Sequence, residues 1–100
     1  MDLSDLTKMA RVIVTLKIMQ TSPEVDLSQI EKNSLPLIQN FAKDLQYKSE
    51  QQPIAFGLKA LILTFVMDES IGSTEKLENE IAAIEGVNSV EVTDVRRAIG

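Results

Sequence analysis

The stretch LKALILTFVM, residues 58–67, is the part of the sequence that most constrains the fold. Two apolar sets alternate along it, namely Leu61, Leu63, Phe65 and Met67 in one, and Ala60, Ile62 and Val66 in the other. Because side chains of a strand alternate between its faces, an extended chain here is apolar on both sides. We therefore predict a central strand that begins just after a turn at Gly57.

Three further segments are predicted to form strands that flank this one. The stretch RVIVTLKIM, residues 11–19, places Val12, Val14, Leu16 and Ile18 on one face, which is typical of a half-buried strand starting at Ala10. The segment LQYKSEQQPIAF, residues 45–56, is polar, and Pro53 restricts it to an edge position. The segment SVEVTDV, residues 89–95, alternates as a last strand, after which RRAIG closes the chain.

Two helices are predicted between the strands. The first begins at the N-cap Asp26 and ends near Lys43, with an apolar stripe made by Leu27, Ile30, Leu37, Ile38, Phe41 and Leu45. Pro36 removes a backbone donor, so we expect either a kink there or a second helix start capped by Ser34.

The second helix carries Leu77, Ile81 and Ile84 on its apolar side. We expect Ser73 or Thr74 as its N-cap, and Gly86 as a left-handed C-cap.

The resulting order β-α-β-β-α-β predicts an α+β fold of the ferredoxin-like βαββαβ type. In such a sandwich two helices cover one face of a four-stranded antiparallel sheet, here with strand order 4-1-3-2. We further take strands one and three to run parallel. On that reading Arg96 and Arg97 lie beside Phe56-Gly57 at one edge, and the residues before strand one emerge there too.

Composition excludes several classes of function. The 100 residues include no Cys and no His, which removes thiolate and zinc sites and the commonest general base. We therefore predict a protein that is not an enzyme and holds no cofactor and no metal. A net charge of −5 disfavours direct nucleic-acid binding, and no apolar stretch reaches the ~20 residues of a membrane span. We expect a cytoplasmic protein without a membrane partner.

Two short polar motifs have both a structural and a functional interpretation. The pair Asp68-Glu69 suits a solvated turn, with a metal site as the alternative. The run 72–74, Gly-Ser-Thr, suits helix capping, with an anion site as the alternative.

Phe56 and the terminal arginines also allow two interpretations each. Phe56 is either buried under the sheet edge or presented to a partner as a binding hot spot. Arg96 and Arg97 are either solvated charges that pair with Asp94, or a cationic tip for an acidic or phosphate-binding site.

Five segments spread over Met9 to Ile99 resemble the archaeal elongation factor 1-beta family. They are, in order, RVIVTLKIM, SPEVDL, PIAFGLKAL, IEGVNSVEV and DVRRAI. The resemblance implies a ferredoxin-like fold and a guanine-nucleotide exchange factor. Its partner would be elongation factor 1-alpha, the GTPase that carries aminoacyl-tRNA. Exchange in this family displaces Mg²⁺ and weakens GDP binding without covalent chemistry, after which GTP rebinds.

The resemblance also assigns roles to individual residues. Arg97 matches a lysine that enters the Mg²⁺ site in eukaryotic relatives, and Arg96 could share or take that role. Phe56-Gly57 matches an aromatic-glycine turn that plugs a pocket on the GTPase, and Lys59 matches a basic residue after the glycine. Together with Asp94, these residues form the expected partner-binding surface.

The archaeal members generally begin at the position of Met9. We therefore expect residues 1–8 to be a short extension, either an extra arm or the product of a misplaced start codon, and residues 9–100 to be the exchange domain. The alternative function is a ferredoxin-like domain that binds a small regulatory molecule. An RNA-binding module would need stacking aromatics, and strands one and three offer only Phe65.

Overall fold

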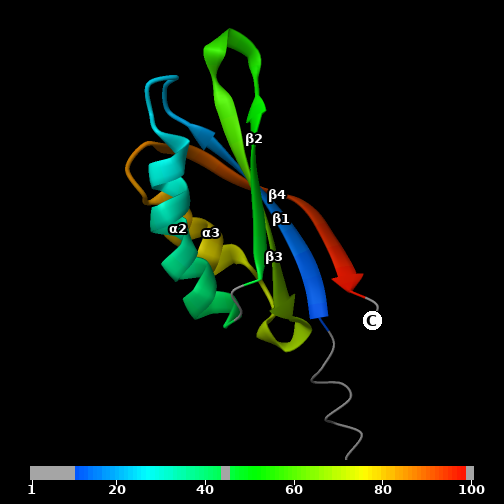
Figure 1. Ribbon diagram of the computed structural model, residues 1–100. Helices are drawn as coiled ribbons and strands as arrows, with labels where there is room; N and C mark the ends of the chain where they lie inside the picture. The colour runs from blue at the N-terminus through cyan, green and yellow to red at the C-terminus, as the bar shows by residue number, and fades with distance from the viewer. Residues whose placement is uncertain (1–10, 44–45, 99–100) are drawn as a thin grey trace, which may run out of the picture.

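The computed structural model describes residues 11–43 and 46–98 (Figure 1). The predicted extension 1–8, the strand start at Ala10 and the helix position Leu45 lie outside these residues. The elements are β1 (Arg11–Gln20), α2 (Leu27–Ala42), β2 (Tyr47–Pro53), η1 (Ala55–Gly57), β3 (Lys59–Asp68), η2 (Glu69–Ile71), α3 (Glu75–Ala82) and β4 (Val87–Ala98).

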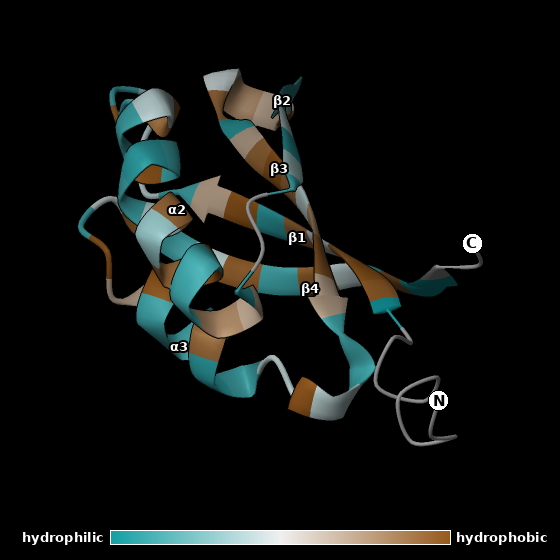
Figure 2. Ribbon diagram, turned by 60° about the horizontal axis from the view of Figure 1, so that its bottom comes forward, coloured by the Kyte–Doolittle hydropathy of each residue, from teal (hydrophilic) through white to brown (hydrophobic). Residues whose placement is uncertain are grey.

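The strands form one antiparallel sheet in the order β2-β3-β1-β4, which confirms the predicted order and the ferredoxin-like α+β fold. Figures 1 and 2 show α2 and α3 on the same side of this sheet. The polar segment β2 is an edge strand and the apolar β3 is central, both as predicted. Arg96 and Arg97 lie within β4, which is longer than the sequence pattern indicated.

The core lies between the helices and one face of the sheet. The sheet contributes every second residue of its two central strands, namely Val14, Leu16, Ile18, Leu61, Leu63, Phe65 and Met67. The helices contribute Leu27, Ile30, Ile38, Ala42, Leu77 and Ile81. Ile62 and Val66, on the opposite face of β3, are only half-buried because no helix covers that side of the sheet.

The predicted strand directions were wrong in one respect. β1 and β3 are neighbours and run antiparallel, with Val12 opposite Met67. The hairpin makes β3 antiparallel to β2, and the crossover through α2 brings β2 back parallel to β1, so β3 must oppose β1. β3 and β4 therefore run in the same direction, and the end of β4 lies at the opposite end of the sheet from the β2–β3 turn.

The first helix is continuous, and Pro36 lies inside it. The expected second start at Ser34 was therefore wrong. Ser34 is buried within the helix and its Oγ donates a hydrogen bond to the Ile30 carbonyl at 2.7 Å. Asp26 is the N-cap as predicted, accepting from the Ser28 amide, and Lys43 ends the helix in the left-handed conformation.

The second helix ends earlier than predicted, so Ile84 lies beyond it. Thr74 is its N-cap residue, while the Ser73 hydroxyl accepts a hydrogen bond from the Glu75 amide. The C-cap is Ala83 in a right-handed conformation, and the assignment of Gly86 as the cap was wrong. Gly86 has φ +92° in the turn before β4, where a Cβ would lie 2.8 Å from Val25 Cγ1.

Candidate functional site

The β2–β3 turn presents Phe56 to solvent. The Leu58 amide donates to the Ala55 carbonyl at 3.3 Å, and Phe56 and Gly57 both have positive φ, +63° and +77°. Positive φ at both central positions is typical of a type I′ β-turn. Here the turn lies in a three-residue hairpin loop, residues 55–57, closed by the hydrogen bond from the Ile54 amide to the Leu58 carbonyl at 2.7 Å. Phe56 is 94% exposed, which excludes burial under the sheet edge.

The conformation of Phe56 is unusual for its residue type. The left-handed region suits Gly and Asn, whereas a bulky aromatic residue there is an outlier. Such a residue destabilises the native state by about 1–3 kcal/mol. The ring is not buried, so no packing energy offsets this strain. The turn therefore exposes an aromatic side chain at a cost in stability.

A buried polar side chain fixes the backbone beneath this turn. Gln20, only 3% exposed, accepts from the Lys59 amide at 2.7 Å and donates to the Val25 carbonyl at 2.8 Å. It thereby ties the start of β3 to the loop after β1. Lys59 itself is exposed. Sequence reasoning missed Gln20 because its partner Lys59 is 39 residues away and a lone glutamine carries no periodic signal.

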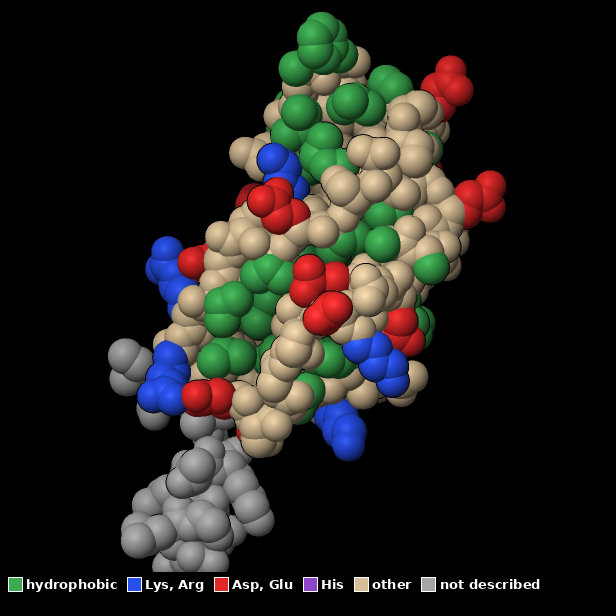
Figure 3. All heavy atoms as spheres, turned by 180° about the vertical axis from the view of Figure 1, so that it is seen from behind, with side chains coloured by type: hydrophobic (Ala, Val, Ile, Leu, Met, Phe, Trp, Pro, Cys, Tyr) green, Lys and Arg blue, Asp and Glu red, His purple; other side chains and the backbone are tan. Residues whose placement is uncertain are grey.

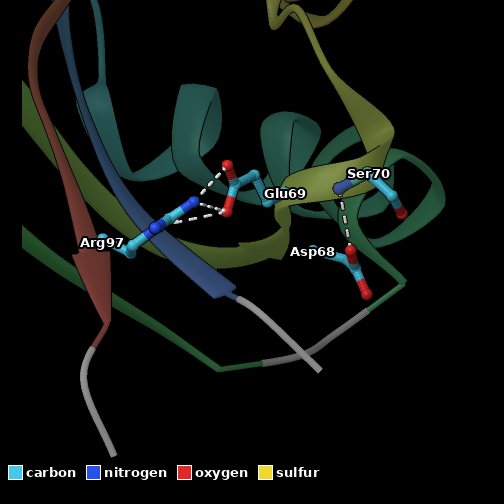
Figure 4. A network of polar contacts seen from close by, with 4 residues as sticks. All are labelled: Asp68, Glu69, Ser70 and Arg97. Atoms are coloured by element: carbon cyan, nitrogen blue, oxygen red, sulfur yellow. Dashed lines mark hydrogen bonds and ion pairs between the residues drawn. The ribbon is translucent and has the colours of Figure 1, made fainter. Parts of the chain in front are cut away.

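At the other end of the sheet, Arg97 reaches from β4 to Glu69 in η2 (Figure 4). Nη2 donates to both carboxylate oxygens at 2.6 and 2.7 Å, and Nε donates to Oε2 at 3.2 Å. This hydrogen bonding with Glu69, together with the charge of that carboxylate, raises the pKa of Arg97 above its ordinary value. The guanidinium is therefore charged at neutral pH.

The turn that carries Glu69 is held by its neighbour. Asp68 Oδ1 accepts from the Ser70 amide at 2.8 Å. The hydrogen bond from the Ser70 backbone lowers the pKa of Asp68, and a side-chain hydrogen bond with Ser70 and the charge of Arg11 act in the same direction. Both carboxylates of the Asp68-Glu69 pair are thus engaged by protein groups. In the part of the chain that the structure describes, no cluster of three or more acidic side chains is placed to hold a metal ion.

Arg96 pairs with Asp94, the partner that the sequence suggested, through Nε and Oδ2 at 2.8 Å. The register places Arg97 opposite Val12 and Arg96 opposite Ile13. Because consecutive strand residues face opposite ways, the two arginines lie on opposite faces of the sheet. Arg97 is on the side that carries the helices, as its partner Val12 packs against the core.

The predicted site residues therefore form two groups. Phe56, Gly57 and Lys59 lie at the β2–β3 turn, and Asp94, Arg96 and Arg97 lie near the end of β4. The length of β3 separates them by about 25–30 Å at ~3.3 Å per residue. The expectation that the arginines lie beside Phe56 was wrong, since it depended on the wrong direction of β3. For the same reason the start of β1 lies at the arginine end.

The two ends also differ in surface character. Seen from behind, Figure 3 shows hydrophobic side chains gathered at the tip of the hairpin, while basic and acidic side chains are mixed toward the opposite end.

The run 72–74 lies at the start of α3, and its hydroxyl groups bond to residues of that helix. Thr74 Oγ1 donates to Glu78 Oε2, and the Ser73 hydroxyl accepts from the Glu75 amide. Among the described helices, none is long and apolar enough to cross a membrane.

Comparison with known proteins gives this geometry a context. The family described as the EF-1 guanine nucleotide exchange domain matches residues 13–98. Elongation factor 1-beta of Methanothermobacter thermautotrophicus is 42% identical over 89 residues, covering 89% of this chain and 98% of its own. The protein of the same name from Methanobrevibacter smithii is also 42% identical, with the same coverage, and that from Staphylothermus marinus is 40% identical. The chain therefore belongs to the EF-1 guanine nucleotide exchange domain family, a family of nucleotide-exchange factors in translation elongation.

Proposed function

We propose that the protein promotes release of GDP from elongation factor 1-alpha, and so its reloading with GTP, in the cytoplasm. It acts without covalent chemistry, by displacing Mg²⁺ and disturbing the phosphate site of the GTPase. Residues 9–100 are the exchange domain and residues 1–8 an extension of it. The observation that carries the proposal furthest is Phe56, 94% exposed on a strained turn in a chain of this family.

Phe56 supplies an apolar anchor. Burying an exposed aromatic ring in a pocket of a partner is among the largest single contributions to a protein interface. Gly57 allows the turn to place the ring at its apex, and the exposed Lys59 adds a cation at the start of β3, two residues after the turn glycine. The buried Gln20 fixes this backbone before binding, so little ordering remains to be done on association.

Arg97 supplies a cation at the other end. A guanidinium competes with Mg²⁺ for carboxylate and phosphate oxygens, and its planar shape suits two-point contacts with such groups. Arg96, held by Asp94 on the opposite face, is the substitute if the GTPase approaches from that side.

The separation of the two groups defines how the factor binds. A contact about 25–30 Å long cannot lie within a single pocket. We therefore propose that Phe56 and Arg97 engage two different regions of the GTPase, with Arg97 at the Mg²⁺ site and Phe56 at a pocket remote from the nucleotide.

The experiment measures release of a fluorescent GDP analogue from elongation factor 1-alpha, with and without this protein. We expect strong acceleration, and acceleration of no more than a few-fold would contradict the proposal. Lys59→Ala should weaken the acceleration, whereas Lys76→Ala, which removes an exposed lysine of α3 remote from the proposed contacts, should not. A protein that fails in this assay would fit the alternative of a small-molecule regulatory domain, in which Phe56 has no role.

A further inference from the structure

Arg97 and Glu69 come from different elements, and their contact fixes the direction of the guanidinium. Nε and Nη2 both donate to the Glu69 carboxylate. None of the contacts among the described residues involves Nη1. Because a guanidinium is planar, holding two of its nitrogens also fixes where the two N–H groups of the third point.

The backbone that carries this carboxylate is held by hydrogen bonds of its own. Glu69 follows directly on the central strand β3, and its carbonyl accepts from the Gly72 amide at 3.2 Å. The preceding residue, Asp68, accepts from the Ser70 amide, so η2 is closed by hydrogen bonds on both sides of Glu69. Arg97, in contrast, is near the end of an edge strand.

We propose that Glu69 is a positioning residue for Arg97. It holds the guanidinium so that the Nη1 edge is presented to an oxyanion, either a carboxylate or a phosphate, in the Mg²⁺ site of the GTPase. This inference rests on the proposed function and concerns how one of its two contacts is made.

Stability alone does not account for the pair. The two side chains are 68% and 44% exposed, and exposed ion pairs contribute little to folding. The neighbouring pair of Arg96 and Asp94 offers a comparison, because both of its members belong to β4 and move together. Of these two pairs, it is the Arg97 pair that joins its guanidinium to a second element, η2.

Positioning by Glu69 also requires that residue 97 is an arginine. A lysine ammonium has a single nitrogen that rotates freely, so pairing with Glu69 would hold its charge without setting a direction for the remaining N–H groups. Glu69 should therefore matter when residue 97 is arginine and lose its effect when it is lysine.

The test is a titration of elongation factor 1-alpha, loaded with the fluorescent GDP analogue, with wild type and four variants: Glu69→Gln, Arg97→Ala, Arg97→Lys, and Glu69→Gln combined with Arg97→Lys. Glu69→Gln should lower the maximal release rate about five- to tenfold, while the half-saturating concentration changes less than about twofold. Glu80→Gln, the same change on an exposed residue of α3, is the matched control. In the Arg97→Lys background, Glu69→Gln should have no further effect.

The outcomes separate this inference from the function on which it rests. If wild type does not accelerate release, the proposed function fails. If wild type is active and Arg97→Ala is slow, but Glu69→Gln keeps the full maximal rate, only the positioning role is overturned. An equal effect of Glu69→Gln in the Arg97→Lys background would also overturn it, since the carboxylate would then act independently of arginine geometry.

Binding to the nucleotide-free GTPase identifies the oxyanion. If Glu69→Gln weakens binding to this nucleotide-free form, the acceptor is a carboxylate of the protein. If binding to the nucleotide-free form is unchanged while the release rate from the loaded form falls, the acceptor is a phosphate. Unchanged binding together with an unchanged release rate would contradict the inference.

Discussion

The β2–β3 turn and the end of β4 both present side chains to a partner, but the fold supports them in different ways. The turn displays an apolar ring on strained backbone, and a buried glutamine holds the structure beneath it. The end of β4 displays charges held by exposed ion pairs. An exposed aromatic must be held by its backbone because nothing packs against its ring, whereas a charged group can be oriented by its own hydrogen bonds.

The largest expected effect comes from removing both contacts at once. Phe56→Ala, and Arg96→Ala combined with Arg97→Ala, should each reduce acceleration of GDP release at least about tenfold, as expected for hot-spot loss. Because the two ends share no contact, their free energies should add, and the triple variant should lose about a hundredfold. A triple variant no worse than Phe56→Ala would show that the two ends do not act independently.

The next effect is on stability and separates the two kinds of support. Gln20→Ala leaves the Val25 carbonyl and the Lys59 amide without their buried partner, so the free energy of unfolding should fall by about 2 kcal/mol. Arg97→Ala removes only an exposed ion pair and should change the unfolding free energy by less than about 1 kcal/mol. Urea denaturation measures both, with Gln52→Ala, on the exposed edge strand, as the control for loss of a glutamine. Equal losses of unfolding free energy in Gln20→Ala and Arg97→Ala would show that the two ends are not supported in different ways.

A third prediction concerns the strain at the turn. Phe56→Asn places a residue that tolerates the left-handed conformation before Gly57, so the free energy of unfolding should rise by about 1 kcal/mol. The same variant lacks the ring and should be as slow in GDP release as Phe56→Ala, which keeps most of the strain. If Phe56→Asn is no more stable than Phe56→Ala, the turn is not strained by its aromatic residue.

The smallest effect is a pH dependence at the other end. The pKa of Asp68 is lowered from 3.8 by the hydrogen bond from the Ser70 amide. A carboxyl whose folded pKa is depressed stabilises the fold above its unfolded pKa, and this contribution is lost as pH falls through the folded value. The Ser70 amide resonance should therefore titrate with a midpoint below 3.8, and Asp68→Asn should abolish that transition. A midpoint at or above 3.8 would show that Asp68 does not hold η2 as described.

The strands and their order could be predicted from the sequence because a buried face leaves a period of two, as in Val14, Leu16 and Ile18. The direction of β3 could also have been predicted, since the hairpin between β2 and β3 and the crossover through α2 determine it. The error lay in combining the two. The continuous helix through Pro36 was not predictable from local propensity, because tertiary packing of its apolar face overrides the missing donor.

The candidate site was predictable only in part. Sequence pattern and family resemblance singled out Phe56 and the arginines, but hydrophobicity alone cannot distinguish a core aromatic from a displayed one. The contact between Arg97 and Glu69 joins residues 28 positions apart and has no local signature. The pairing of Arg96 with Asp94, two residues away on the same strand face, was the kind of contact that spacing can suggest.

The placement of the two groups at opposite ends of β3 has a consequence for how this chain can change over evolution. If both contacts are used together, the length of β3 sets the distance between them. Inserting two residues into it would lengthen the span by about 7 Å while keeping every side chain on its face, and inserting one would exchange the buried and exposed faces. Loops such as the one before α2 can vary in length without this penalty, so we expect insertions and deletions among relatives to be found there and to be excluded from β3.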